Sequence, residues 1–233
     1  KKQMKKTFTL SLLITFSTIL TAQVNIKKCA TTEMVNKSIK EDVRNYFSMK
    51  DAVDMNAKWL KDNKGLERKT VITVPIVIHV VHRTNHSNIG SGTNISNDQI
   101  EDGLRILNED YSKTNPEFPN PPRNTFVNYA GNAQLQFCLA TEDENGNSTT
   151  GITRTSTTKT NFDVDGNEEM KRTSTNGKDG WDPDKYLNIW ICDIVNAGVG
   201  QILGYSYLPG TAWPLWKDGV VVDYRYFGTI GVS

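Results

Sequence analysis

A nearly continuous run of apolar, β-branched residues occupies positions 71–81, with the sequence Val-Ile-Thr-Val-Pro-Ile-Val-Ile-His-Val-Val. A strand with one solvated face alternates apolar and polar residues, whereas a strand covered on both faces carries a run like this one. Proline removes a backbone donor, so Pro75 is expected near the strand start or where its nitrogen faces no partner. The run predicts the central strand of a covered sheet.

Further strands and one helix extend this pattern. Residues 133–140, 186–192, 204–208 and 220–222 are typical of strands, because each is largely apolar and bounded by turn residues. A helix is expected after an N-cap with a glutamine three positions on, followed by apolar residues at helical spacing: Ser96, Gln99, Ile100, Leu104, Ile106, Leu107 and Tyr111. Residues 155–176 are rich in Ser, Thr and Asn and are expected to form a loop. We therefore predict an α/β (α+β) fold with a twisted mixed sheet and a backing helix.

Composition excludes several classes of protein. The 233 residues are 37% hydrophobic and 23% charged, with a formal net charge of +1. Such a balance provides no long-range field that would attract nucleic acid or anionic lipid. No glycine-rich nucleotide motif and no zinc-finger spacing occurs in the sequence. We expect no nucleic-acid partner.

The first residues have the pattern of a secretory signal. Lysines at positions 1, 2, 5 and 6 precede an apolar run over residues 8–20, and Ala22 offers a small residue for cleavage. A membrane anchor is the alternative, but spanning a bilayer takes about 20 apolar residues. We expect a signal peptide over residues 1–22, secretion to the extracellular space and no membrane span after its removal.

A helical segment is expected next. Apolar residues recur at steps of three and four between positions 33 and 61, which predicts one or two amphipathic helices. The turn at residues 62–65 ends this segment, and the polar, basic sequence at 66–69 suits proteolytic nicking. We expect a removable segment over residues 23–69, with cleavage after Arg68 or Lys69.

The expected export bears on the redox state of the three cysteines. Cys138 and Cys192 each lie in a strand-like run and can pair in an oxidising compartment, with a gain of about 4 kcal/mol. Cys29 is then left over, which suggests an intermolecular bridge, a reactive thiol or a mispaired surface thiol. Lys27 and Lys28 beside it favour the thiolate.

The C-terminal third of the sequence resembles the pappalysin family. The order Tyr-Leu-Asn-Ile-Trp-Ile-Cys, Leu-Gly-Tyr-Ser-Tyr-Leu-Pro-Gly, Asp-Gly-Val-Val-Val-Asp and Phe-Gly-Thr carries the resemblance between positions 186 and 229. Residues 71–81, Gly151-Ile-Thr-Arg and the helix at residues 95–111 also fit, so the likeness covers residues 71–229 well and the earlier segment loosely. Pappalysins are secreted zinc endopeptidases of the metzincin clan. The resemblance implies that residues 70–233 form the N-terminal part of a metalloprotease catalytic domain preceded by a helical pro-segment, with Zn²⁺ as the cofactor of the whole enzyme.

The zinc-binding motif of that family does not occur in this sequence. In pappalysins, the tract ending at Thr229 leads into a helix bearing His-Glu-x-x-His-x-x-Gly-x-x-His, whose histidines hold zinc while the glutamate is the general base. The resemblance therefore implies a latent metalloendopeptidase whose catalytic residues lie beyond Ser233, with these residues inactive by themselves and with proteins or peptides as substrates.

Two further roles follow from the resemblance. A thiolate can occupy the open position of a catalytic zinc, and pro-segments of some pappalysins carry such a cysteine, so Cys29 is a candidate latency switch, although Ala30 replaces the usual glycine after it. In metzincins an edge strand forms the upper rim of the cleft and pairs with extended substrate. The candidates for that strand are Gly204, Tyr205, Ser206, Tyr207 and Leu208, and an edge strand with no substrate role is the alternative.

Several other polar and aromatic residues are expected to have structural roles. His79 and His82 point to opposite faces of one strand, so we do not expect them to share a metal. Residues 142–147 form an acidic turn that is either a Ca²⁺ site or a solvated turn, and their ligand order favours the turn. We expect solvated surface for the acidic group at residues 163–169 and a local apolar clasp for Trp213 and Trp216.

A second class of function fits the same residues. Exposed aromatic residues and edge strands are also typical of secreted β-rich modules that bind glycan or protein without a metal. Sequence beyond Ser233 distinguishes the two classes, because only a peptidase requires the paired histidines.

Overall fold

The computed structural model describes residues 29–66, 70–118, 124–196 and 200–231. The expected signal peptide over residues 1–22 and the expected cleavage residues Arg68 and Lys69 lie outside these ranges. Within them, no helix combines the length and the apolar character needed to cross a membrane.

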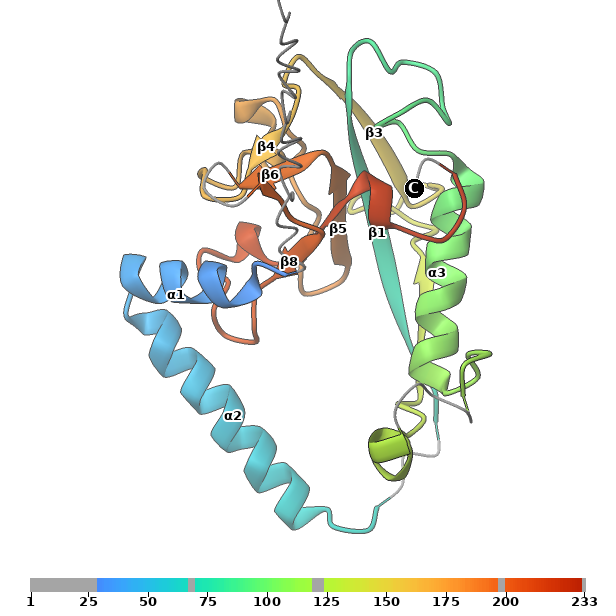
Figure 1. Ribbon diagram of the computed structural model, residues 1–233. Helices are drawn as coiled ribbons and strands as arrows, with labels where there is room; N and C mark the ends of the chain where they lie inside the picture. Colours follow the sequence, from blue (N-terminus) through green and yellow to red (C-terminus); the bar gives the residue numbers. More distant parts are fainter. Residues whose placement is uncertain (1–28, 67–69, 119–123, 197–199, 232–233) are drawn as a thin grey trace, which may run out of the picture.

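The central sheet is built around β1 (Ile72–Arg83), as the apolar run predicts (Figure 1). Strands β2 (Leu135–Leu139) and β3 (Ile152–Thr157) pair in parallel with successive parts of one edge of β1. Strand β5 (Leu187–Cys192) pairs in parallel with its other edge, beginning at Ile76, so Pro75 lies before that ladder starts. Strand β9 (Val220–Asp223) is parallel to β5, and β8 (Gly204–Ser206) is antiparallel to β9 at the edge.

Both faces of this sheet are covered. Ile76, Ile78 and Val80 of β1 pack with Ile189 and Ile191 of β5 in one apolar cluster, on the side of α3 (Asn97–Ser112). Alternate residues of β5, including Trp190 and Cys192, belong to a second cluster on the opposite face. That face is covered by α1 (Thr31–Glu41) and by a small sheet of β4 (Phe162–Asp163), β6 (Ile194–Asn196) and β7 (Gly200–Gln201). The fold is mixed α/β with a twisted, mostly parallel sheet, as expected.

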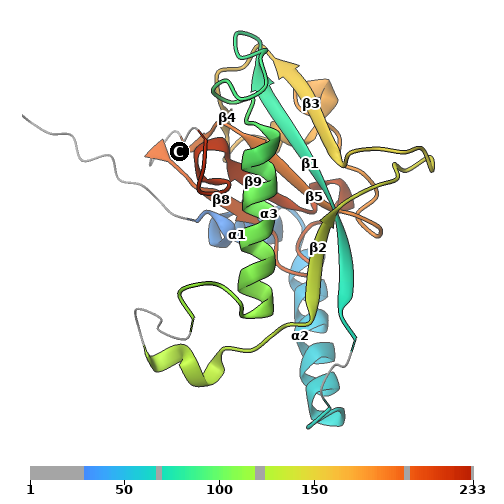
Figure 2. The same cartoon turned by 90° about the vertical axis from the view of Figure 1, so that its right-hand side faces the viewer.

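Helix α3 begins as the sequence predicts. The hydroxyl of Ser96 accepts a hydrogen bond from the backbone N–H of Gln99 at 3.1 Å. The side chain of Gln99 does not close a reciprocal capping box. It instead donates to the carbonyl oxygens of Tyr224 (3.1 Å) and Phe227 (2.9 Å), which ties the helix to the C-terminal segment. Figure 2 shows α3 lying along the sheet.

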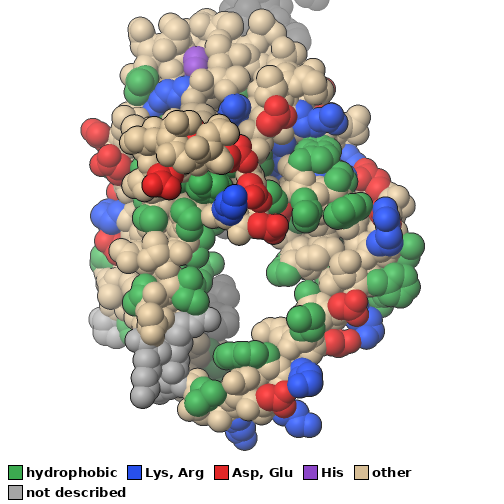
Figure 3. Space-filling view, turned by 180° about the vertical axis from the view of Figure 1, so that it is seen from behind, with side chains coloured by type: hydrophobic (Ala, Val, Ile, Leu, Met, Phe, Trp, Pro, Cys, Tyr) green, Lys and Arg blue, Asp and Glu red, His purple; other side chains and the backbone are tan. Residues whose placement is uncertain are grey.

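The N-terminal segment forms two helices, α1 (Thr31–Glu41) and α2 (Arg44–Asp62). Met34 and Val35 of α1 are buried against the body, whereas α2 projects away from it (Figures 1 and 2). Figure 3 shows open space between α2 and the rest of the molecule, with apolar side chains on both sides of it. The apolar stripe of α2 is exposed, as at Phe47, Val53 and Trp59. The contacts of α2 with the body of the molecule thus come from its first turns.

Two expectations are corrected. Residues 155–176 are not a plain loop, because β3 extends to Thr157 and β4 and short 3-10 turns follow. The remaining 3-10 turns are η1 (Asn124–Tyr129), η4 (Leu215–Lys217) and η5 (Tyr224–Tyr226).

The predicted disulfide is also wrong, since Cys138 and Cys192 are free thiols. Strand β1 lies between their strands, and two strand spacings of roughly 4.8 Å each already exceed the span of about 4.4–6.8 Å between disulfide-linked Cα atoms. The two cysteines are also far apart along the strands, because Cys138 is level with Pro75 and Ile191 is level with Val80.

Candidate functional site

The predicted rim residues lie at the edge of the central sheet. Gly204, Tyr205 and Ser206 form β8, and Tyr207 and Leu208 continue from it. The side chains of Tyr205 and Tyr207 are buried, at 3% and 9% exposure, so they face the core rather than solvent. Since β8 pairs with β9 on one side only, its other side presents backbone groups, as required of a strand that pairs with an extended peptide.

The N-terminal segment occupies that outer side of β8. The backbone N–H of Ala30 donates to the carbonyl oxygen of Gly204 at 3.2 Å. The backbone N–H of Ser206 donates to the hydroxyl of Thr31 at 3.1 Å. Successive backbone groups of a strand alternate in direction, so both bonds use the side that faces away from β9. Ala30 and Thr31, at the start of α1, therefore take the position that a pairing peptide would need.

Cys29 lies at this edge. It is exposed, and its thiol contacts the hydroxyl of Thr31 at 3.3 Å. Together with Gly204, Ser206 and Tyr226 it lines an open pocket along β8 and β9. The structure thus places Cys29 beside the candidate rim strand, although Cys29 is not the one unpaired cysteine that was expected, because Cys138 and Cys192 are free as well.

A buried charged cluster supports β8 from within. The ammonium of Lys171 lies 2.9 Å from the Glu168 carboxylate, and the two side chains are 0% and 3% exposed. The hydroxyls of Tyr205 and Tyr207 donate to that carboxylate at 2.8 and 2.7 Å. Burial lowers the pKa of Lys171 and raises the pKa of both tyrosines, with the charge of Glu168 adding to the tyrosine shifts. The prediction of solvated surface is wrong for Glu168, since folding buries it against residues distant in the chain.

The other acidic residues of that group are less buried. Asp165 and Glu169 lie near the surface, where Lys159 pairs with Glu169 at 2.7 Å. The carbonyl oxygens of Asp165 and Gly166 accept hydrogen bonds from Lys37 of α1, at 2.8 and 3.0 Å. This loop therefore also contributes to the seat of α1.

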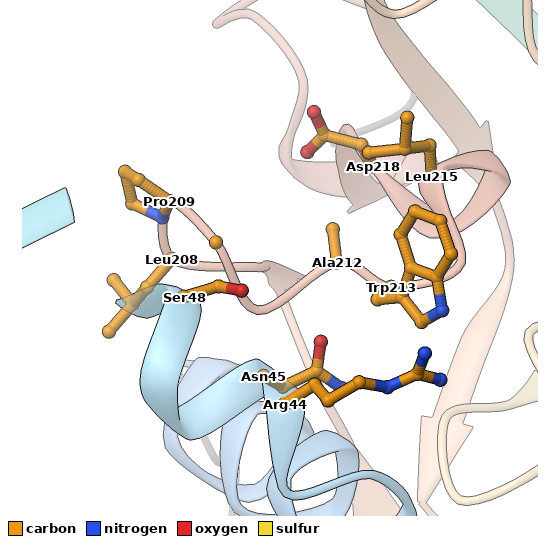
Figure 4. A pocket seen from close by; sticks show the side chains of 10 residues that line it. Arg44, Asn45, Ser48, Leu208, Pro209, Ala212, Trp213, Leu215 and Asp218 are labelled. Atoms are coloured by element: carbon orange, nitrogen blue, oxygen red, sulfur yellow. The ribbon is translucent and has the colours of Figure 1, made fainter. Parts of the chain in front are cut away.

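A second contact holds the N-terminal helices at residues 208–218. The hydroxyl of Ser38 donates to the carbonyl oxygen of Thr211 at 2.6 Å, and the amide of Asn45 donates to the hydroxyl of Ser38 at 2.7 Å. Lys217 pairs with Glu41 at 2.9 Å. Figure 4 shows Arg44, Asn45 and Ser48 of α2 facing Ala212 and Trp213 across a pocket.

Both tryptophans are exposed, at 48% for Trp213 and 36% for Trp216, so they are not enclosed in the expected apolar clasp. The guanidinium of Arg44 lies 5.9 Å from the ring centre of Trp213, and that of Arg172 lies 4.9 Å from the ring centre of Trp216. Because Trp213 lies under α2, its environment changes if the N-terminal segment leaves.

The three histidines occupy separate environments. His79 is fully buried between Thr153 Oγ1 (2.8 Å) and Asn188 Oδ1 (2.9 Å), and burial lowers its pKa to about 4. His82 contacts the carbonyl oxygen of Arg83, and His86 contacts Thr93. Over the part of the chain that the structure describes, no three His, Cys, Asp or Glu side chains come together as a metal site. The described residues alone do not form a catalytic zinc site.

The acidic turn at residues 142–147 uses its own carboxylate. Asp143 accepts hydrogen bonds from the backbone N–H groups of Asn145 (2.9 Å) and Asn147 (2.8 Å). The bonds from Asn147 lower the pKa of Asp143. The Asp143 carboxylate thus stabilises the turn by accepting hydrogen bonds from its backbone.

One charge network was not predicted from the sequence. Asp193 lies between Arg83 and Arg225, and Arg225 also pairs with the buried Asp223 at 2.7 Å. Burial raises the pKa of Asp193, while both arginines oppose the shift. The network joins the ends of β1, β5 and β9, and no sequence signal linked residues that lie so far apart.

An apolar groove lies between α3 and the strands β5 and β9. Its volume is about 450 Å³, and Leu107, Ile189, Val222 and Phe227 are among its lining residues. The segment that follows β9 runs along it, with the N–H and hydroxyl of Thr229 both donating to Asp102.

Comparison with solved structures gives neighbours that include mirolysin. Mirolysin in complex with compound 9 is 38% identical, with a TM-score of 0.61 over 70% of this chain and 57% of that chain. Mature mirolysin of Tannerella forsythia, in complex with a cleaved peptide, is 37% identical, with a TM-score of 0.62 over 71% of this chain and 57% of that chain. A promirolysin mutant of the same organism is 32% identical, with a TM-score of 0.70 over 89% of this chain and 62% of that chain.

These neighbours are peptidases, and the chain spans about three-fifths of their length. No protein-family model and no curated protein matches the chain. The fold is metzincin-like, as expected. The agreement in sequence and in fold with mirolysin supports the metalloprotease family for this chain.

Proposed function

We propose that this chain is the N-terminal part of a secreted, pappalysin-like zinc metalloendopeptidase that is made in a latent form. Residues 1–22 are its signal peptide, residues 23–69 its pro-segment and residues 70–233 the first part of its catalytic domain. The observation that carries the proposal is the seating of Ala30 and Thr31 on the outer side of β8, with Cys29 beside it.

The comparisons support the division into pro-segment and catalytic domain. Promirolysin covers 89% of this chain and mature mirolysin 71%, a difference of 18% of 233 residues, or about 42 residues. That length is close to the segment that contains α1 and α2. A segment shared with a proenzyme and seated on an edge strand has the properties of an inhibitory pro-segment.

The role of the edge is to bind extended peptide. Once residues 23–69 are removed, Gly204 and Ser206 regain a free backbone carbonyl and a free backbone N–H, and a substrate strand pairs with them by β-augmentation. Proteins or peptides are therefore the substrates. Zinc would be held by side chains outside this sequence, and when bound it would activate the water that attacks the peptide bond.

Latency is assigned to the Cys29 thiol. A thiolate that occupies the open position of a catalytic zinc displaces the water needed for hydrolysis. The exposure of Cys29 and its place at the rim strand support this role.

The full-length protein tests the proposal. We expect it to contain zinc and to cleave peptides only after loss of residues 23–69, and we expect Cys29→Ala to be active without processing. Cys138→Ala is the matched control, because it removes a free thiol far from the β8 edge and should leave latency intact. A full-length protein with neither zinc nor peptidase activity would reject the function. Normal maturation of an Arg68→Ala/Lys69→Ala variant would reject the cleavage site alone.

A further inference from the structure

An ion pair lies buried on the inner side of β8 and takes no part in the function proposed above. Glu168 and Lys171 are almost completely excluded from solvent and lie 2.9 Å apart. The Lys171 ammonium also donates to the carbonyl oxygen of Lys217 at 2.5 Å and lies 5.1–5.2 Å from the ring centres of Trp190, Tyr205 and Tyr207. Both charges are thus compensated within a closed cluster.

The two tyrosines connect this cluster to β8. Tyr205 and Tyr207 are two residues apart, so their side chains extend to the same side of the extended chain. One carboxylate oxygen of Glu168 accepts the Tyr205 hydroxyl and the other accepts the Tyr207 hydroxyl. Hydrogen bonds to an ionised acceptor are the stronger kind. Glu168 therefore fixes the strand at two points.

Stability alone does not account for this arrangement. A buried ion pair is often no more stabilising than apolar residues of the same volume, because both charges lose their hydration. Glu168 also adopts a left-handed backbone conformation, with φ of 55°, which is strained for a residue other than glycine. A charged group buried at such a cost in free energy indicates that it serves to position the residues bound to it.

The groups that need this positioning lie at the outer edge of β8, away from β9. The carbonyl oxygen of Gly204 and the N–H of Ser206 flank Tyr205 in the chain, and both face outward, where they bind Ala30 and Thr31. We propose that Glu168 and Lys171 form a clamp that positions β8 through Tyr205 and Tyr207, so that these two outward groups are preorganised to pair with an extended peptide. That the peptide is a substrate rests on the proposed function, whereas the clamp itself acts on the N-terminal segment as well.

Removing only the hydroxyl groups tests the clamp. The Tyr205→Phe/Tyr207→Phe variant retains both rings and the ion pair, so it should fold. In the processed full-length protein we expect KM for peptides to rise about tenfold, which corresponds to about 1.4 kcal/mol, with kcat within about twofold of the unmutated value. Tyr186→Phe is the control, because its hydroxyl donates to the carbonyl oxygen of Glu142 away from β8.

A second measurement uses the unprocessed full-length protein and does not depend on activity. Hydrogen exchange at the Ser206 amide should be at least about tenfold faster in the double variant than in the Tyr186→Phe control. An unmutated full-length protein without peptidase activity would reject the proposed function and leave the exchange measurement to decide the clamp. Unchanged exchange at Ser206 in the double variant overturns the clamp, and so does a fall in kcat with unchanged KM.

Discussion

Gly210 lies so close to α2 that a Cβ at this position would stand 2.6 Å from the carbonyl carbon of Ser48. The two backbones are therefore in direct contact, and Gly210 itself has a φ of 81°. This contact lies beside the Ser38–Thr211 hydrogen bond, at a distance in sequence of more than a hundred residues. The docking of the N-terminal helices therefore depends on the absence of a side chain at Gly210.

Gly210→Ala should displace α2 from residues 208–213. The added methyl group meets backbone atoms that have no alternative rotamer, so either the helix or the loop must move. We expect a loss of stability on the order of 1–3 kcal/mol and faster proteolysis between residues 62 and 70. Gly146→Ala is the matched control, because Gly146 has a φ of 80° with no atom near its Cβ position. Equal proteolysis of the two variants would contradict the docking role of Gly210.

The three thiols should differ in reactivity. Cys29 is exposed, Cys138 is partly buried and Cys192 is fully buried, and burial raises the pKa of the Cys192 thiol well above its usual value. Because the thiolate is the reactive form, a disulfide reagent should modify Cys29 first and Cys192 only on unfolding. Three thiols should titrate in denaturant without any reductant. A titration of one thiol per chain would indicate that Cys138 and Cys192 form a disulfide after all.

Acid should destabilise the protein through His79. Its pKa in the folded protein is about 4, below the usual histidine pKa of 6.5, since the buried ring resists charging. The unfolded chain thus binds more protons between these values, so the contribution of His79 is complete above pH 6.5 and is lost as pH falls toward 4. The full effect is about 3 kcal/mol.

Urea unfolding at pH 7.5 and pH 4.5 measures this dependence. His79→Gln should reduce the difference between the two free energies of unfolding, whereas the same change at the partly exposed His86 should leave it nearly as large. An unaltered difference in the His79→Gln protein would show that other groups carry the acid sensitivity.

Gln99→Glu should loosen the C-terminal segment from α3. The change replaces the amide that donates to Tyr224 and Phe227 with a carboxylate that faces two carbonyl oxygens. A buried acceptor opposite acceptors should cost about 1–3 kcal/mol of stability, measurable by urea unfolding. Gln136→Glu, at an exposed position of β2, makes the same chemical change at little cost. Similar losses in the two variants would argue against the role of Gln99.

Local signals accounted for much of the fold. The β-branched run of β1 predicted a covered central strand because it carries no polar face. Ser96 predicted the start of α3 because its hydroxyl satisfies a backbone donor of the first turn. The sequence did not predict segments whose structure depends on a pairing partner, such as β3, whose polar residues form a strand by pairing with β1.

The candidate site was only partly predictable for the same reason. The sequence identified Cys29 as a leftover thiol and residues 204–208 as an edge strand, but nothing local indicated that the two meet. Glu168 was expected in solvent because its neighbours in the sequence are acidic and polar. The cysteine pairing failed because strand order, which no periodicity encodes, places β1 between the two strands.

The amino-acid sequence by itself determined the apolar strands of the central sheet and the helices, because apolar periodicity and capping act over a few residues. Only the tertiary structure decided which side of β8 is covered, which carboxylate is buried and which thiols lie apart. Those outcomes depend on contacts between residues distant in the chain, such as Ala30 with Gly204 and Glu168 with Tyr207. Their energies arise only when the sheet has assembled and water has been excluded.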